Sequence, residues 1–320
     1  MKQFDSIESL QDYLSGSLQN TPDTAYEVKL DVTDIAGLGD LIREAKKYVS
    51  LELSGVTEIP KDAFYNREFR YSKNPYLTSV TIPDTVTSIG GSAFSSCTGL
   101  TSITIPDSVT SIEAWAFHDC ESLTSVTIPN GVTGIGDGTF RYCRNLTSIT
   151  IPDSVTGIGD CAFEDCAGLT SVTIGNSVAS IGDRAFYRCT GLTGIAIPDS
   201  VASIGDSAFD ECTGLADVTL SDSLTSIEQF TFRKCKKLKG ITIPASVAYI
   251  GKSAFIGCAK LTIVTFLGDL DSDGLDEHAF RGLGDLRNKY LAGGRGTYIT
   301  VKPDKTAVWT KQCNRQKNRF

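Results

Sequence analysis

A step of 23 residues, kept by several columns of apolar side chains, constrains this chain more than any other feature. One column is cysteine, at Cys97, Cys120, Cys143, Cys166, Cys189, Cys212, Cys235 and Cys258. A second column is phenylalanine, at Phe94, Phe117, Phe140, Phe163, Phe186, Phe209, Phe232 and Phe255. Leucine keeps the same step from Leu77 to Leu261, and isoleucine keeps it from Ile89 to Ile250. A fixed interval of this length indicates a structural repeat, in which one turn of chain is built many times over.

Each unit contains the signals for two inward-facing segments and a turn. Residues 79–82 alternate between polar and apolar, which predicts a strand. Pro83 lacks an N–H group, so it ends the pairing of that strand. Val86 and Ile89 supply a second inward pair, and Gly90 begins the turn that follows. Eight full units cover 77–260, and one degenerate copy at each end brings the expected number of turns to ten.

The repeat also predicts how the whole chain is organised. A single unit cannot enclose a core, whereas stacked units bury a continuous one. Neighbouring turns are expected to pair their strands, with a rise of about 4.8 Å per turn. We therefore expect one elongated domain in three parts. These are an N-terminal α/β cap at 1–47, a repeat region at 48–282, and a C-terminal cap with a basic tail at 283–320.

The two end segments carry signals of their own. In the first, an N-cap signal at 5–8 predicts a helix over about 6–15, alternation predicts a strand over 26–32, and helical spacing predicts a helix over 38–48. In the last, helical spacing follows residue 283, and 297–301 is expected to form a short last strand that Trp309 covers. Such segments shield the apolar ends of a stack. The tail at 311–320 is polar and basic.

Composition and charge argue against several classes of function. The 320 residues include 38 acidic and 30 basic ones, and the net charge of −8 argues against general nucleic-acid binding, which needs Lys and Arg to neutralise phosphates. No apolar run reaches the roughly 20 residues that span a bilayer. The two histidines, His118 and His278, lie about seven repeat steps apart, and the sequence contains no catalytic constellation or cofactor motif. We expect a protein that is not an enzyme and holds no cofactor.

The unit resembles the BspA-like class of leucine-rich repeats, which is found in bacterial surface proteins. The matching residues are the Leu-x-x-Val-x-Ile-Pro start, the Val-x-x-Ile-Gly middle and the Ala-Phe-x-x-Cys end of each unit. The resemblance covers about 48–282. It implies a right-handed solenoid that is mostly β with short helical turns and has a parallel sheet on its concave face. It also implies a protein-binding role, in bacterial adhesion or in contact with host matrix or surface proteins.

The repeat cysteines allow two interpretations. Each lies three residues after the Phe and three before the next Leu, so we expect a buried column of reduced thiols that pack as small apolar side chains. Disulfides between adjacent turns are the alternative, because stacked turns bring Cα atoms near the lower end of the disulfide range. Cys161 and Cys166 are the only close pair, and they lack the C-x-x-C spacing typical of metal ligands.

The outward side chains of the concave strands form the broadest expected surface, and we assign protein binding to it. They are mostly hydroxyls and nearly uniform from turn to turn, a pattern that also suits strand packing. The residues are Ser79, Thr81, Ser102, Thr104, Ser125, Thr127, Ser148, Thr150, Ser171, Thr173, Asp217, Thr219 and Thr242.

Departures from the repeat gather in a second place, the Ala-Phe-x-x-Cys half of the units. Aromatic and basic residues predominate there, and aromatic residues and Arg are typical anchors of interfaces in other proteins. They are Trp115, His118, Arg141, Tyr142, Arg144, Arg184, Tyr187, Arg188, Phe230, Arg233, Lys234, Lys236 and Lys237. We interpret this side as ordinary variable surface.

An acidic stretch copies the first half of a calcium-binding loop. Asp269, Asp271 and Asp273 have the spacing of the first three ligands. The twelfth position, which requires a bidentate Glu, is Phe280. We expect an acidic surface insertion and no resident metal, with a weak Ca²⁺ site as the alternative.

The sequence leaves several functions open. A protein-binding module is the first hypothesis, a structural scaffold or intracellular interaction protein without an adhesive role is the second, and an enzyme is the last. The family implies secretion or display at the cell surface, yet no signal segment follows Met1, so a cytoplasmic location is the alternative. We expect a monomer whose partner is a protein, with no nucleic acid and no transmembrane segment.

Overall fold

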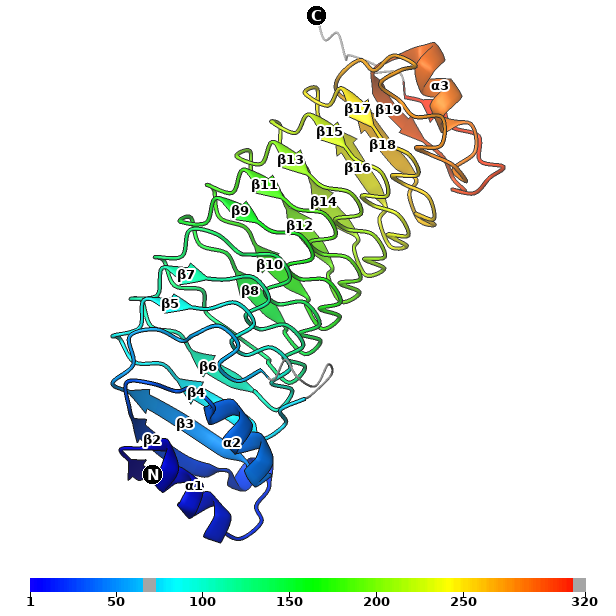
Figure 1. Cartoon of the computed structure of the whole chain (residues 1–320). Helices are drawn as coiled ribbons and strands as arrows, with labels where there is room; N and C mark the ends of the chain where they lie inside the picture. Colours follow the sequence, from blue (N-terminus) through cyan, green and yellow to red (C-terminus); the bar gives the residue numbers. More distant parts are fainter. Residues whose placement is uncertain (66–72, 313–320) are drawn as a thin grey trace, which may run out of the picture.

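The computed structural model describes residues 1–65 and 73–312 and shows a long column of stacked turns (Figure 1). The N-terminal helices lie at one end of the column, and helix α3 (Leu286–Gly293) lies at the other. The solenoid predicted from the 23-residue step is confirmed. Residue 67, the position at which the first degenerate copy departs from the cysteine column, lies outside the described residues.

Two ladders of short parallel strands run along the column. The broad ladder consists of β4 (Leu77–Thr81), β6 (Ser102–Thr104), β8 (Ser148–Thr150), β10 (Ser171–Thr173), β12 (Gly194–Ala196), β14 (Asp217–Thr219), β16 (Gly240–Ile243) and β18 (Ile263–Phe266). The narrow ladder consists of β5 (Ser88–Ile89), β7 (Ser111–Ile112), β9 (Gly157–Ile158), β11 (Ser180–Ile181), β13 (Ser203–Ile204), β15 (Ser226–Ile227) and β17 (Tyr249–Ile250). Pairing joins the same position of successive units, as in Ser148 with Ser171 and Ser180 with Ser203. This register keeps one set of side chains inward through the whole stack.

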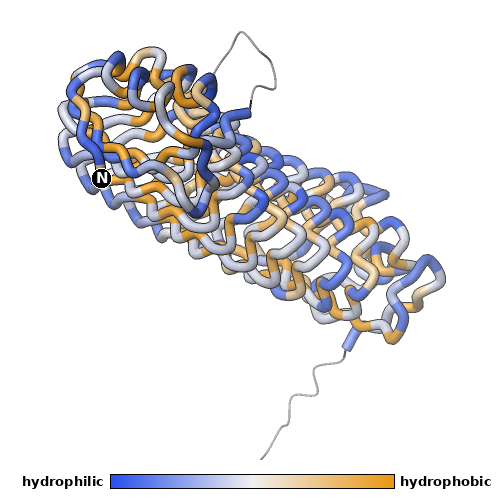
Figure 2. Tube along the Cα trace, turned by 90° about the horizontal axis from the view of Figure 1, so that it is seen from below, coloured by the Kyte–Doolittle hydropathy of each residue, from blue (hydrophilic) through white to orange (hydrophobic). Residues whose placement is uncertain are grey.

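A continuous ladder of phenylalanine rings fills the core. From Phe64 through Phe163 to Phe280, successive ring centroids lie 5.0–5.6 Å apart with nearly parallel planes. Each ring therefore has a copy of itself above and below, an arrangement that adds to the energy of burial. Figure 2 shows hydrophobic stretches recurring from turn to turn along the column.

The turn around each phenylalanine uses left-handed backbone at two positions. In the first unit these are Ser92 (φ 56°) and Ser96 (φ 58°), two residues before and two after the ring. The third unit has Gly138 at the first of these positions. A Cβ atom on Gly138 would lie 2.4 Å from the ring of Trp115 in the preceding turn, so only glycine leaves room for that ring.

The N-terminal cap continues the sheet of the repeats. Its elements are β1 (Lys2–Phe4), α1 (Ile7–Gly16), a short 3₁₀ helix at Pro22–Thr24, β2 (Tyr26–Asp31) and α2 (Leu38–Ala45), and they lead into β3 (Val49–Ser54). The predicted helices and strand are confirmed, and the N-cap of α1 is Ser6, whose Oγ accepts the N–H of Ser9 at 3.2 Å. The structure adds β1, which the sequence reasoning missed. Strands β1, β2, β3, β4 and β6 pair in parallel as one sheet, so the sheet runs past residue 47 without a break.

The C-terminal end is closed by antiparallel strands. Strand β19 (Gly296–Ile299) pairs with β18, and β20 (Thr310–Lys311) pairs with β19. Trp309 is 1% exposed, and its ring N–H donates to the carbonyl of Leu283 at 2.6 Å. The predicted strand at 297–301 is confirmed as β19, although β20 follows it as the last strand. That Trp309 covers this strand stays a prediction. The part of the tail at 313–320 lies outside the described residues.

Candidate functional site

The outward side chains of the broad ladder, named here the strand face, occupy the positions that the sequence predicted. The parallel register aligns them in two columns, one on each side of an inward residue such as Ile149. Twelve of the thirteen predicted residues are exposed. The exception is half-buried Ser79, whose Oγ lies 2.6 Å from that of Ser50 in the preceding turn.

Most hydroxyl groups in the middle of the strand face have no hydrogen-bond partner within the described chain. Among the described residues, those of β6, β8 and β10 make no hydrogen bond to another protein group. The threonines one position earlier behave differently, because Thr170 Oγ1 donates to the carbonyl of Thr147 at 3.0 Å and so fastens two turns together. The column of hydroxyls that includes Thr170 thus links successive turns, while the two columns of the strand face point to solvent.

One turn interrupts the strand face. Residues 125–128 lie where a strand is expected between β6 and β8, yet none of their backbone groups hydrogen-bonds either neighbouring turn within the described chain. At the equivalent place in a later unit, the N–H of Ile151 donates to the carbonyl of Thr173 at 2.9 Å. The backbone polar groups of this turn are therefore available to a ligand.

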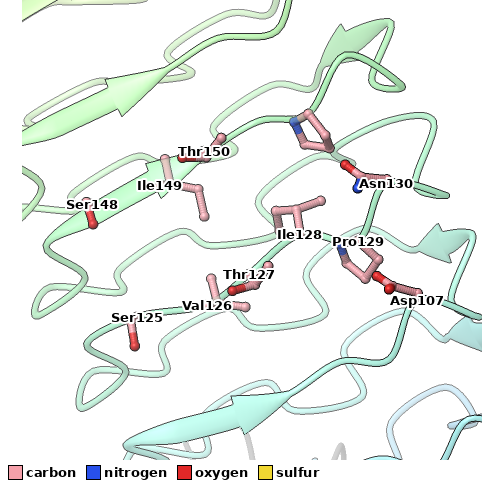
Figure 3. A pocket seen from close by; sticks show the side chains of 11 residues that line it. Asp107, Ser125, Val126, Thr127, Ile128, Pro129, Asn130, Ser148, Ile149 and Thr150 are labelled. Atoms are coloured by element: carbon pink, nitrogen blue, oxygen red, sulfur yellow. The ribbon is translucent and has the colours of Figure 1, made fainter.

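A hollow of about 390 Å³ opens at this turn (Figure 3). Its walls carry Ser125 and Thr127 from one turn and Ser148 and Thr150 from the next. Asp107 and Asn130 add a carboxylate and an amide at the corner. The sequence reasoning missed these two corner residues. Its available signal was the Asn130-Gly131 pair, which stands where four of the other seven regular units have Asp-Ser.

The aromatic and basic departures form a second surface, and several of its charges pair across turns. Arg141 lies 2.6 Å from Glu164, and Arg233 lies 2.5 Å from Asp210. Both carboxylates are almost fully buried, and each pair joins residues 23 apart. These two arginines therefore hold successive turns together. Reading the sequence by columns for opposite charges one step apart would have found both pairs.

An aromatic group surrounds Arg141. The ring of His118 lies 5.4 Å from Trp115 and 5.5 Å from Tyr142, centroid to centroid, and the guanidinium lies 4.7 Å above the tyrosine ring. Burial, aided by the nearby Arg141 charge, lowers the pKa of His118 to about 4. This histidine is therefore neutral at physiological pH and acts here as an aromatic side chain.

The repeat cysteines are buried donors. Seven of their thiols, from Cys120 to Cys258, lie 3.0–3.3 Å from the carbonyl oxygen of the phenylalanine in the preceding unit. The nine cysteines within the described residues are free, and burial raises the pKa of Cys258 to about 12. Burial and a hydrogen bond to Glu164 also raise the pKa of half-buried Cys161 to about 12. None of these thiols has the low pKa of a nucleophile.

The acidic stretch near residue 270 is a turn. Oδ1 of Asp271 accepts the N–H groups of Asp273 at 3.0 Å and Gly274 at 2.8 Å. Within 1–65 and 73–312, no three His, Cys, Asp or Glu residues gather in a way that could hold a metal ion. The calcium alternative therefore has no cluster of ligands to support it.

The parallel ladders and the repeated Leu-x-x-Val-x-Ile-Pro and Ala-Phe-x-x-Cys segments define a leucine-rich-repeat solenoid. The model of the BspA-type leucine-rich repeat region matches the chain over residues 57–193 and 179–292. The chain belongs to this family.

Similar chains occur among solved structures, and the first of them supports the same class. A leucine-rich repeat protein from Bacteroides ovatus is 27% identical with a TM-score of 0.50, and the match covers 76% of this chain and 73% of that one. A leucine rich cell surface protein from Faecalibacterium prausnitzii is 31% identical with a TM-score of 0.35, over 75% and 83%. The leucine-rich repeat protein of T. pallidum is 32% identical with a TM-score of 0.48, over 52% and 78%. No curated protein matches the sequence.

Proposed function

We propose that this protein is a non-enzymatic, protein-binding module that attaches the cell carrying it to matrix proteins or to other cells. The observation that carries the proposal is the strand face with its hollow at residues 125–130. Free hydroxyls, a carboxylate, an amide and unpaired backbone groups converge there on a rigid support. Proteins of this repeat class offer extended surfaces to protein partners.

The physical basis is pre-organisation. The strand face is fixed by the stack behind it, with Ile149 and its neighbours packed on the phenylalanine ladder. Binding therefore costs little ordering of this chain. Serine and threonine hydroxyls both donate and accept hydrogen bonds, so they match the polar groups of a partner backbone in either direction.

Reaction chemistry has little support among the described residues. The histidine at 118 is neutral and enclosed by aromatic rings, and the cysteine thiols have raised pKa values. Proteins of this family generally bind and do not catalyse, which supports the non-enzymatic role.

We also propose display at a cell surface, because BspA-type repeat proteins are usually surface-associated. Within the described residues, no helix is both long and apolar enough to cross a membrane. Protease treatment of intact cells that express the protein, followed by immunoblotting, tests this location, and complete protection of the protein would contradict it.

Binding can be measured by surface plasmon resonance against a panel of purified matrix proteins. We expect saturable binding to at least one of them, and we expect a Thr127→Arg/Thr150→Arg variant to lose at least tenfold in affinity because its long side chains fill the hollow. The matched control is Thr225→Arg, at an exposed threonine beside the narrow ladder, which should bind normally. An equal loss of affinity in both variants would contradict binding at the strand face. Absence of saturable binding throughout would favour the scaffold alternative.

A further inference from the structure

Charge is distributed unevenly around the column. We name as the basic edge the eight-residue segments that run from two residues before each repeat phenylalanine to two residues after each repeat cysteine, at 92–99, 115–122, 138–145, 161–168, 184–191, 207–214, 230–237 and 253–260. These segments contain 9 of the 11 basic residues of units 77–260 but only 6 of their 18 acidic residues. The basic edge therefore has a net charge of +3, and the rest of the same units has −10.

Some cations of the basic edge are occupied by cross-turn pairs, and others are free. Glu211 lies 3.0 Å from Arg188 and 2.6 Å from Lys234, so one carboxylate serves both cations. Within the described chain, four exposed cations of the edge have no acidic partner within ion-pair distance. They are Arg184, Lys236, Lys237 and Lys260. The positive charge of these four side chains is therefore available to pair with a carboxylate of another molecule.

Aromatic rings lie beside three arginines of the basic edge, and one of these, Arg184, is among the four free cations. The guanidinium of Arg188 lies 5.1 Å from the centroid of the Tyr187 ring, and that of Arg184 lies 5.7 Å from the same centroid. Two repeats further along the stack, the guanidinium of Arg233 lies 4.9 Å from the centroid of the Phe230 ring. Cation–π contacts of this kind restrict the side chains before any partner arrives, which lowers the entropy cost of binding.

We propose that the basic edge binds a carboxylate-rich, extended polypeptide segment of a partner protein. Carboxylates of the segment pair with the free lysines and Arg184, and apolar side chains between them pack on Tyr187 and Phe230. The turns that carry these two rings are two repeats apart, a separation of about 10 Å along the stack. An extended chain spans this separation with about three residues. The inference rests on the proposed function in one respect, which is that the partner is a protein.

The composition of the edge favours a polypeptide over a nucleic acid or a sulfated polysaccharide. Those polyanions carry a dense and uniform charge, and they bind surfaces with many adjacent cations. Here carboxylates such as Glu121 and Glu211 lie among the cations, and rings lie between them. A segment that mixes acidic and apolar residues matches this alternation better than a uniform polyanion does.

Fluorescence anisotropy tests the inference with a fluorescein-labelled twelve-residue peptide of alternating Glu and Leu as the probe. We expect saturable binding that weakens as salt increases. A Lys236→Glu/Lys237→Glu variant should lose about tenfold or more in affinity. The matched control is Lys252→Glu, an exposed lysine of the same region outside the edge, which should lose less than about twofold. Circular dichroism checks that each variant is folded.

Three outcomes would overturn the inference. They are no saturable binding of the peptide, an equal loss in Lys252→Glu, and tighter binding of heparin or a single-stranded oligonucleotide than of the peptide. The strand-face variant Thr127→Arg/Thr150→Arg should bind the peptide normally. If the unaltered protein binds matrix proteins but does not bind the peptide, the basic edge alone is rejected and the proposed function stands.

Discussion

The interior of the stack and its C-terminal end enclose the core by different means. In the interior, each buried side chain meets its own copy, as Phe163 does between the rings of Phe140 and Phe186. At the C-terminal end no further copy of the repeat follows. There Phe266 of β18, Tyr290 of α3 and Tyr298 of β19 pack together, and β18 and β19 are antiparallel. The strand direction reverses where the repeat stops.

The difference shows where a solenoid tolerates change. An interior defect is shared by two neighbouring turns, because stability in such proteins is roughly a sum of repeat and nearest-neighbour interface contributions. A defect at the end affects one interface but exposes the apolar face of the last turn. The following predictions compare these two regions, beginning with the largest effect.

Alkaline pH is expected to act on the interior most strongly. Burial raises the pKa of the repeat thiols, to about 12 for Cys258, above the ordinary value near 9. Above pH 9 only the unfolded chain ionises its thiols, so this stabilisation is complete below pH 9 and is lost as the pH rises towards the folded pKa. Each thiol contributes up to roughly 1.4 kcal/mol per pH unit. Urea unfolding followed by circular dichroism between pH 8 and 11 measures the decline.

The double variant Cys166→Ala/Cys189→Ala separates thiol ionisation from packing. Its free energy of unfolding should be lower at pH 8 because of the cavities it creates. Its decline with pH should nevertheless be shallower by about two thiols, or roughly 2.8 kcal/mol per pH unit. A decline as steep as that of the unaltered chain would show that thiol ionisation is not the cause.

Interrupting the phenylalanine ladder should produce the next largest loss. Phe163 is fully buried, so Phe163→Ala removes a ring from two stacking contacts and leaves a cavity. We expect the free energy of unfolding to fall by about 3–5 kcal/mol. Urea denaturation measures this loss, and Phe163→Leu, which retains most of the volume, should lose clearly less. A loss below about 1 kcal/mol for Phe163→Ala would contradict the ladder's role.

Removing the tryptophan at the end should produce a more local effect. Trp309→Ala deletes a fully buried ring and its hydrogen bond to Leu283. We expect faster amide hydrogen exchange in β18, β19 and β20, with the exchange of β8 and β10 nearly unchanged. Mass spectrometry locates the exchange along the chain. Equal acceleration in the central strands would show that the end and the interior unfold as one unit.

The contribution of each cross-turn ion pair to stability should depend on how deeply the pair is buried. Asp210 is almost fully buried and accepts two hydrogen bonds from Arg233, whereas Arg188 and Glu211 lie near the surface. Arg233→Ala leaves a buried carboxylate unpaired and should cost about 2 kcal/mol, reduced from the fully buried case because the arginine is partly exposed. Arg188→Ala should cost less than about 1 kcal/mol. Adding Asp210→Asn to Arg233→Ala should recover part of the loss in urea unfolding.

Much of the fold could be read from the sequence, because the same signal occurs many times. A strand of three residues, such as β8, is too short to predict alone, but eight copies in one register define it. The strand β1 occurs once and has no such support. The hollow was missed for a related reason. Its turn keeps the inward residues Val126 and Ile128 of the repeat, so residues 125–128 themselves give no sign that their backbone pairing is lost.

The two proposed binding surfaces were predicted unevenly from the sequence. The strand face follows from alternation, because side chains next to an inward residue must face outward. The basic edge was visible as a set of departures from the repeat, yet which of its cations are free depended on distances. Arg233 and Lys237 look alike in the sequence, but only Arg233 reaches a buried carboxylate.

The sequence by itself determined the period, the inward columns and the caps, since each depends on local spacing and on the burial of apolar side chains. Only the tertiary structure decided where the pairing of turns is lost, at residues 125–128, and which charged side chains form ion pairs within the chain. The physical reason is that hydrogen bonds and ion pairs require atoms at specific separations. Residues 23 apart reach such separations only after the chain has stacked.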